Sequence, residues 1–156
     1  MMNVILPILL SISPISELRG GIPAALASGF SPIAAFLICV LANALVILPI
    51  FFFLDYLHSH LLKLDFYRKI SEKILGRARK KANKVEKGMN NYGYLALCIF
   101  TAIPLPMTGA YTATLIAWLL GLNKTKSFVS IAFGVLIAGI LVTLASIGVM
   151  KVLAIS

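Results

Sequence analysis

The stretch SELRGGIP at residues 16–23 interrupts the first apolar run of the chain and decides how the fold is interpreted. Its two glycines, Gly20 and Gly21, permit a sharp reversal of the backbone. The proline that follows them suits the first turn of a new helix. The stretch therefore predicts a break at which the chain turns back, followed by a short return helix over residues 24–28.

The composition around this stretch is typical of a membrane protein. Of the 156 residues, 60% are apolar and 12% are charged, and the mean hydropathy is +1.00. Runs without any charge cover residues 1–16, 20–54, 88–123 and 127–150. Because such runs cannot form a water-facing surface, they exclude secreted, nuclear and cytosolic enzymes. We expect one all-α integral membrane domain over residues 1–156.

Only two segments are long enough to cross a membrane. A helix needs about 20 apolar residues to cross about 30 Å of hydrocarbon. Residues 32–54 and 128–153 meet this requirement, and we expect Pro49 to kink the first of them. The run over residues 1–16 is too short to cross, and the second apolar block is interrupted by a Pro- and Gly-rich stretch at residues 103–109.

The two halves of the chain repeat one pattern. Each contains an apolar run, a break, a short return helix, a glycine turn and a long span, with Gly20 and Gly109 in the breaks and Gly29 and Gly121 in the turns. Two crossings mean that the two hairpins enter from opposite sides of the membrane, so we predict an inverted repeat of a re-entrant helical hairpin plus a transmembrane helix. In the alternative interpretation, residues 92–120 form one kinked span.

A basic connector, residues 55–91, joins the first repeat (residues 1–54) to the second (residues 92–156). Ten of the 14 Lys and Arg residues lie within residues 63–87, together with three acidic residues. Apolar residues recur there at steps of three or four, which predicts an amphipathic helix on the membrane surface. A basic segment tethered between apolar spans favours anionic lipids over nucleic acid as its partner. The positive-inside rule then predicts a multi-pass protein of the cell membrane with a cytoplasmic connector and both termini outside.

The residues at the two breaks are candidates for a substrate or proton site. Non-helical backbone near the middle of a bilayer needs surrounding protein or a water-filled cavity. Return helices that begin near Ile22 and Ala110 would direct their positive N-terminal ends into this centre. Arg19 adds a permanent charge. Glu17 is a candidate proton carrier, because a low-dielectric surrounding disfavours a charged carboxylate. In the alternative, the two side chains only pair with each other or with loop backbone and stabilise the hairpin.

Polar side chains elsewhere could line the opposite wall of this site. Thr108 lies in the second break, Tyr111 and Thr112 follow it, and we expect Asn43 to face in from the first span. Each of them could equally bond a neighbouring helix carbonyl. The predicted site comprises the residues of both breaks and of the first span: Glu17, Arg19, Gly20, Gly21, Asn43, Pro104, Pro106, Thr108, Gly109 and Tyr111.

Other kinds of chemistry have no motif in this sequence. It contains no nucleotide-binding glycine loop, no clustered metal ligands and no nucleophile paired with a base. We therefore predict that the chain is not an enzyme and uses neither a cofactor nor a metal. The small residues Gly134, Gly139 and Gly148 in the last span permit close helix packing and predict a homodimer.

Two stretches resemble the small multidrug export protein family. They are residues 16–23 and residues 102–111 (AIPLPMTGAY), and the resemblance covers nearly the whole chain. This family is similar to the wider DedA-like group. The members of that group look like paired re-entrant hairpins, and they include proteins linked to the translocation of polyprenyl phosphate or phospholipid and to proton-dependent drug resistance.

The resemblance implies roles for particular residues. Glu17 and Arg19 match the charged positions of the first hairpin, and Met107 stands where the second motif leads us to expect a smaller residue. The positions that match the second hairpin are Pro104, Pro106, Thr108 and Gly109.

Three functions follow from this sequence. The first is a proton-linked transporter or exporter with an anion-compatible site between the hairpins. The second is a DedA-like lipid or polyprenyl-phosphate flippase or scramblase, and the third is a membrane scaffold that transports nothing. The partners expected are membrane lipids, protons and a small-molecule or lipid-phosphate substrate.

Overall fold

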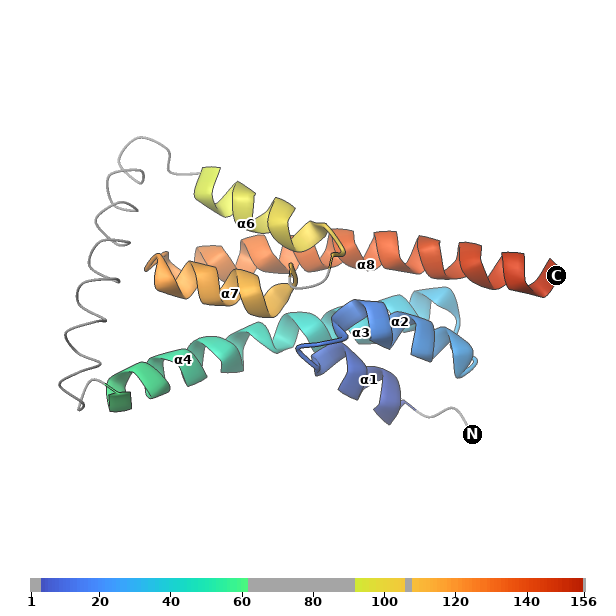
Figure 1. Cartoon of the computed structure of the whole chain (residues 1–156), viewed down its shortest axis with the longest axis horizontal. Coiled ribbons are helices and arrows are strands. Elements are labelled where there is room, and N and C mark those ends of the chain that lie inside the picture. Colours follow the sequence, from blue (N-terminus) through green and yellow to red (C-terminus); the bar gives the residue numbers. More distant parts are fainter. Residues whose placement is uncertain (1–3, 62–91, 106–107, 156) are drawn as a thin grey trace.

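The structure, a computed structural model, describes residues 4–61, 92–105 and 108–155 (Figure 1). The regular elements in these ranges are all helices, as predicted. The basic amphipathic helix, Pro106 and Met107 lie outside the described residues. The helices are α1 (Ile5–Ile12), α2 (Glu17–Ala27), α3 (Pro32–Leu45), α4 (Ile47–Leu61), α6 (Tyr92–Ala102), α7 (Ala110–Leu119) and α8 (Lys124–Ile155).

Two long helical segments run along the long axis of the molecule and form its frame (Figure 1). By length and composition, α3 with α4 could cross a membrane from Pro32 to His60, and α8 could do so from Lys124 to Val152. Both segments were predicted. They extend beyond the predicted bounds, since the first reaches past Leu54 and the second begins before Phe128.

The first long segment is interrupted between α3 and α4. Pro49 has no N–H to donate to the carbonyl of Leu45, and its ring crowds that carbonyl. The interruption therefore lies at Val46, one turn before Pro49. The predicted effect of this proline is present, but at an earlier residue.

Two helical hairpins pack against this frame. Figure 1 shows that α1 with α2 and α6 with α7 have their bends in the middle of the molecule, while the α2–α3 and α7–α8 turns lie at opposite ends. A helix rises about 1.5 Å per residue, so these helices of 8 to 11 residues are about 12–17 Å long. The helices of each hairpin are therefore about half as long as the hydrocarbon core of a bilayer is thick.

The second hairpin returns the chain to the end at which it began. The hydroxyl of Tyr94, near the start of α6, accepts a hydrogen bond from the backbone N–H of Asn123, next to the start of α8, at 3.3 Å. Lys126 Nζ lies 5.8 Å from the centre of the Tyr94 ring. The beginnings of α6 and α8 are thus neighbours, and the alternative single kinked span over residues 92–120 is not what the structure shows.

The first hairpin bends earlier than predicted. The reversal occupies residues 13–16, where Ser13 is extended because a residue before proline is pushed out of the helical region. Helix α2 already begins at Glu17, so Gly20 lies inside this helix and not in a break. The predicted return helix over residues 24–28, with its start near Ile22, was therefore too short.

Gly20 and Gly21 serve close packing within this hairpin. A Cβ atom at Gly21 would lie 1.9 Å from the Ser11 hydroxyl of α1, and a Cβ at Gly20 would lie 2.6 Å from the Ser16 Cβ. Gly21 thus allows α1 and α2 to approach each other, and Gly20 leaves room for Ser16 in the turn between them. Neither glycine forms the bend.

Both return helices end in the same motif. Gly29 has φ +87° and Gly121 has φ +68°, a left-handed conformation that glycine adopts without strain. In each case the glycine and the next residue donate to the last helical carbonyls, which is the Schellman pattern. After α2, Gly29 N–H donates to the Leu26 carbonyl and Phe30 N–H donates to the Ala25 carbonyl, at 3.0–3.1 Å. After α7, Gly121 N–H donates to the Trp118 carbonyl and Leu122 N–H donates to the Ala117 carbonyl, both at 3.0 Å. The predicted glycine turns are confirmed.

Aligning these two glycines relates the halves by an offset of 92 residues, which is 121 − 29. The offset pairs Glu17 with Gly109, so the predicted pairing of Gly20 with Gly109 is wrong. Buried positions of the return helices follow the same offset. They are Leu18, Gly21, Ile22 and Ala25 in α2, and Ala110, Ala113, Thr114 and Ala117 in α7.

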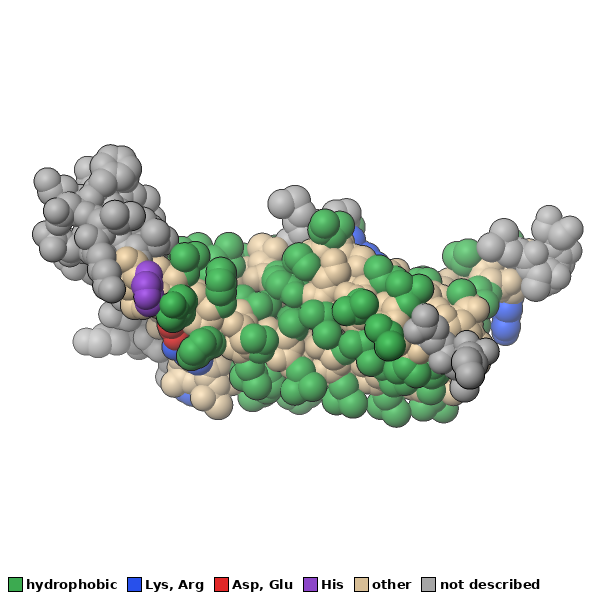
Figure 2. Space-filling model, turned by 90° about the horizontal axis from the view of Figure 1, so that it is seen from below, with side chains coloured by type: hydrophobic (Ala, Val, Ile, Leu, Met, Phe, Trp, Pro, Cys, Tyr) green, Lys and Arg blue, Asp and Glu red, His purple; other side chains and the backbone are tan. Residues whose placement is uncertain are grey.

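The outer surface of the molecule is largely apolar. Figure 2 shows apolar side chains covering most of one face, with the visible histidine and acidic side chains at its left end. Phe52 on α4 is 74% exposed and Leu144 on α8 is 64% exposed. Such continuous apolar surface exceeds what a soluble monomer presents to water, and lipid tails would cover it.

Two of the glycines expected to mediate dimer contacts are used within the chain. A Cβ at Gly134 would lie 2.6 Å from the Cys98 carbonyl of α6, and one at Gly139 would lie 2.5 Å from Val40 Cγ2 of α3. Gly148 has open space around it. The homodimer stays a prediction that now depends on Gly148 and the exposed apolar faces.

Candidate functional site between the two hairpins

Glu17 and Gly109 form the contact between the two bends. Glu17 is 8% exposed, and its carboxylate faces the backbone N–H groups of Ala110 and Tyr111 at the start of α7. A Cβ atom at Gly109 would lie 1.5 Å from Glu17 Oε2. The carboxylate of one hairpin therefore fills the space that the glycine leaves open in the other.

This contact caps helix α7. The first N–H groups of a helix have no partner inside it, and a carboxylate is favourable at this positive end. Gly109, at the N-cap position, has no side chain to supply the acceptor. The N-terminus of α7 was predicted to face the centre with its N–H groups directed at an anion. In this structure that anion is the carboxylate of Glu17.

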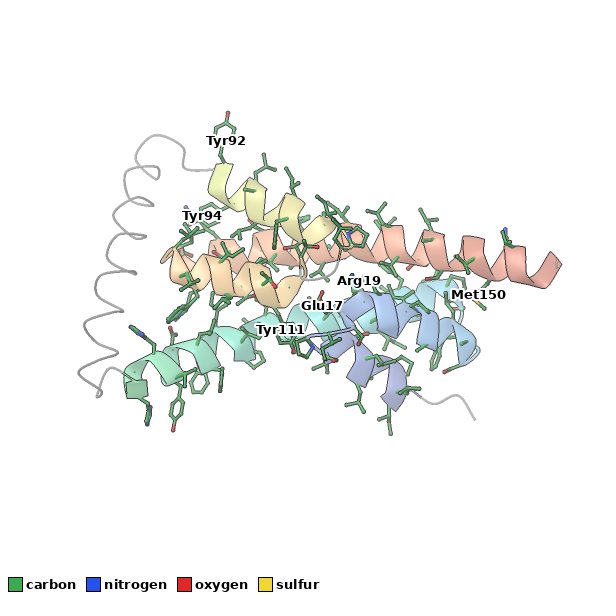
Figure 3. The ribbon with its side chains drawn as sticks, in the orientation of Figure 1. Glu17, Arg19, Tyr92, Tyr94, Tyr111 and Met150 are labelled. Atoms are coloured by element: carbon green, nitrogen blue, oxygen red, sulfur yellow. The ribbon has the colours of Figure 1, made fainter. Side chains whose placement is uncertain are left out.

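Arg19 lies two residues after Glu17 and is half-buried. Its charge interacts with the Glu17 carboxylate. Within the described ranges, the guanidinium has no hydrogen-bond acceptor and no carboxylate within the 4.0 Å of an ion pair. Figure 3 shows Glu17, Arg19 and Tyr111 together in the middle of the molecule.

Tyr111 and Asn43 hold the C-terminal end of α1. The Tyr111 hydroxyl donates to the Ile12 carbonyl, which is a second contact between the hairpins. Asn43 Nδ2 on α3 donates to the Ser11 carbonyl at 2.7 Å, and Asn43 is 1% exposed. The last carbonyls of a helix lack partners in the helix, so these two side chains satisfy them.

The second break is stabilised by its own threonine. Thr108 Oγ1 lies 2.7 Å from the Ile103 carbonyl and 2.8 Å from the Leu105 carbonyl, so its one hydroxyl hydrogen can donate to either, and it accepts from the Leu105 N–H at 3.2 Å. These contacts direct the Thr108 side chain toward the backbone of the loop that contains it. Pro104, in the same loop, lines the space between the hairpins.

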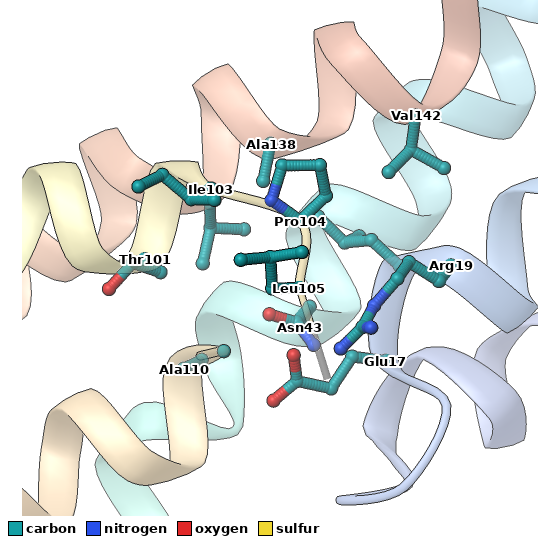
Figure 4. A pocket seen from close by; sticks show the side chains of 13 residues that line it. Glu17, Arg19, Asn43, Thr101, Ile103, Pro104, Leu105, Ala110, Ala138 and Val142 are labelled. Carbon is teal, nitrogen blue, oxygen red and sulfur yellow. The ribbon is translucent and has the colours of Figure 1, made fainter. Parts of the chain in front are cut away.

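A small cavity of about 20 Å³ lies between the hairpins (Figure 4). A cavity of this size holds about one water molecule. Of the predicted site residues, those that line it are Glu17, Arg19, Asn43, Pro104 and Gly109. Gly20, Gly21, Thr108 and Tyr111 are not part of its wall. Thr101 lines the cavity and was not predicted, although a lone polar residue in an apolar run was a usable signal.

Two larger apolar grooves flank the cavity. The α2/α8 groove, of about 430 Å³, lies between Arg19, Pro23 and Ala27 on one side and Leu141 to Met150 on the other. The α4/α7 groove, of about 480 Å³, lies between residues 46–54 and the return helix residues Tyr111, Thr112 and Leu115. The offset of 92 residues relates the two grooves, and it pairs Arg19 with Tyr111.

A polar cluster lies at the end of the frame where α4 ends. Asp55 accepts a hydrogen bond from Trp118 Nε1 at 2.9 Å and pairs with Lys124. The His58 ring meets the Trp118 ring edge-on, with 5.3 Å between the ring centres. The cluster joins α4, α7 and α8, and was not predicted because its members are far apart in the sequence.

A family comparison identifies the chain. The sequence model of the family described as "Putative small multi-drug export protein" matches residues 17–141. The chain belongs to this family. No curated protein and no solved structure matches it. The relation to the DedA-like group therefore stays a prediction.

The small multi-drug export family is described as a family of exporters, which are membrane transporters and not enzymes. The two apolar helical spans agree with a membrane location. The matched region begins at Glu17 and includes both Schellman turns and the second break. It therefore contains the contact of Glu17 with the start of α7, whereas Ile12, which accepts from Tyr111, lies before it.

Proposed function

We propose that this protein is a proton-linked secondary transporter of the cell membrane with its site between two re-entrant hairpins. The observation that carries the proposal is the buried carboxylate of Glu17, which caps α7 of the opposing hairpin beside a water-sized cavity. Ionisable groups buried at membrane depth are costly and commonly mark proton or substrate paths.

The proposed placement in the membrane is an inverted repeat. Two spans of opposite direction and two half-depth hairpins with their bends in the middle support it. Lys124 and Lys126 lie beside the start of α6, where the basic connector rejoins the described chain. The positive-inside rule then favours a cytoplasmic location for this end and an external location for both termini.

The proposed mechanism couples one proton to the contact between the hairpins. Protonation of Glu17 removes the negative charge from the N-terminus of α7 and weakens the cap. The hairpins can then separate and enlarge the cavity. An anionic group of the substrate takes the vacated N–H groups of Ala110 and Tyr111, with Arg19 beside it. The cycle requires no covalent step and no cofactor.

A second candidate function is the movement of a lipid or polyprenyl-phosphate headgroup, as in a DedA-like flippase. The observation that favours it is the α2/α8 groove, where Arg19 lies among apolar residues that lipid tails can reach. The third function, a scaffold, has no comparable support in the described part of the chain.

The test uses the full-length protein in liposomes with an imposed pH gradient. We expect the gradient to drive uptake of soluble organic anions, and Glu17→Gln to abolish its effect. Asp55→Asn is the matched control, since Asp55 is a carboxylate outside the cavity, and it should keep the coupling. Unchanged coupling in Glu17→Gln would remove this residue from the mechanism. Movement of headgroup-labelled lipid without anion transport would favour the second function.

A further inference from the structure

The α2/α8 groove and the central cavity share a wall. Arg19, Pro104 and Val142 line both of them. The cavity has room for about one water molecule, whereas the groove, at about 430 Å³, lies in the lower part of the range of small-molecule pockets, roughly 300–1,000 Å³. A molecule held in the groove would therefore touch the proposed transport site from its side.

Arg19 is the only charged residue among those that line the groove, and the other residues are apolar apart from Ser146. Its guanidinium has no hydrogen-bond acceptor in the ranges that the structure describes. A guanidinium surrounded by apolar groups binds a carboxylate, sulfate or phosphate strongly, because its donors form charge-assisted hydrogen bonds. The chemistry of the groove thus suits an occupant with one anionic end and an apolar body.

The α4/α7 groove provides an internal comparison. It has nearly the same volume and occupies the equivalent place in the other half. At the position of Arg19 it has Tyr111, whose hydroxyl is already bonded to the Ile12 carbonyl. The two grooves therefore agree in shape and apolar lining but differ in charge, and only the α2/α8 groove is complementary to an anion.

We infer that the α2/α8 groove binds a single-tailed amphiphilic anion, with its headgroup on Arg19 and its tail along Leu141, Ala145 and Val149. This inference rests on the proposed transport function and names the substrate class of that site. One tail follows from the volume, which suits one acyl chain or one drug-sized body. Such a molecule would enter sideways from the bilayer.

The test measures binding of a fatty acid with a photoreactive tail to the full-length protein in nanodiscs of phosphatidylcholine. We expect crosslinks on residues 141–150, and Arg19→Gln should weaken binding by about tenfold or more, as for the loss of a charge-assisted hydrogen bond. Ala145→Phe fills the groove and should abolish binding. Leu115→Phe fills the α4/α7 groove and is the matched control, which should bind normally.

Equal binding by Ala145→Phe and the wild type would overturn the inference, as would crosslinks on residues 46–54 in place of 141–150. Stronger competition by two-tailed phosphatidylglycerol than by the free fatty acid would overturn the single-tailed assignment. Measuring fatty-acid binding and proton-linked transport on the same preparations separates this inference from the proposed function. If the fatty acid binds but no proton-linked transport occurs, the proposed function is refuted and the groove inference stands. If Ala145→Phe leaves proton-linked transport intact, the groove is not the substrate site and the proposed function stands.

Discussion

Glu17 and Gly109 occupy equivalent positions in the two hairpins and contribute opposite features to their contact. Glu17 supplies a carboxylate that faces the N–H groups at the start of α7, and Gly109 supplies the space in which that carboxylate lies. The cap on α7 therefore comes from a residue about 90 positions away in the sequence. A local capping residue would hold α7 alone, whereas Glu17 also holds the two hairpins together.

Replacing Gly109 by alanine should destabilise the protein by about 1–3 kcal/mol, as for overpacking of a filled site. The new Cβ would collide with the Glu17 carboxylate and displace it from α7. Thermal unfolding in a mild detergent measures the effect. Gly93→Ala is the control, because open space surrounds Gly93 in the first turn of α6. Equal melting temperatures for the two variants would contradict this account of the contact.

Replacing Asn43 by alanine should lower the free energy of unfolding by about 1–3 kcal/mol, since it leaves the buried Ser11 carbonyl without its side-chain donor. Ser59→Ala removes an exposed bond to the Tyr56 carbonyl and should change stability by less than about 0.5 kcal/mol. Unfolding by heat or denaturant in detergent compares the two. A small effect in Asn43→Ala would show that Asn43 serves the cavity and not the fold.

At the level of helices, the second break was predicted at the right residues, whereas the first was predicted a few residues too late. Residues 103–109 contain two prolines and a glycine. Each of these residue types is unfavourable inside a helix, so all three predict a break in the same stretch. In the first half, glycines serve either a bend or close packing, and sequence alone does not separate these roles. Ser13-Pro14 was the better signal, since a residue before proline leaves the helical region.

The residues that line the cavity were more predictable than their contacts. Charge in an apolar run identified Glu17 and Arg19, and Asn43 was identified as a lone polar residue in a span. The cap that Glu17 forms on α7 depends on how two distant hairpins meet, which no local pattern encodes. The same reason explains why the cluster of Asp55, Trp118 and Lys124 was missed.

Gly29→Ala and Gly121→Ala should each lower the free energy of unfolding by about 1–2 kcal/mol, because a residue with a side chain is strained in the left-handed conformation. Equal costs are expected, since both glycines close the same motif. Gly148→Ala lies in the interior of α8 with free space around it, and it should stabilise by about 0.5–1 kcal/mol. Thermal unfolding of the three variants checks these values. Strongly different losses of stability in Gly29→Ala and Gly121→Ala would argue against equivalent turns.

At the level of the whole molecule, the arrangement predicts which residues share a side of the membrane. Ser59 and Thr125 are exposed at one end of the frame, and Lys151 is exposed on α8 near its other end. In a background without Cys39 and Cys98, a cysteine at Lys151 should react with an impermeant maleimide in intact cells. Cysteines at Ser59 and Thr125 should react only after permeabilisation.

Ala35→Cys is the control for this labelling, because Ala35 is fully buried and should not react from either side. Reaction of Ser59 and Thr125 from opposite sides would show that residues 92–120 cross the membrane. The half-depth hairpin of the second repeat would then be excluded.

The offset of 92 residues that relates the two Schellman turns also sets Glu17 opposite Gly109 in the alignment of the halves. If an ancestral gene duplication produced the two halves, this pair could not have stayed identical. Two acids would place like charges in one small space, and two glycines would leave a void and an uncapped helix. Among homologous sequences, positions 17 and 109 should therefore covary. Sequences with an acidic residue at position 109 should have a glycine at position 17.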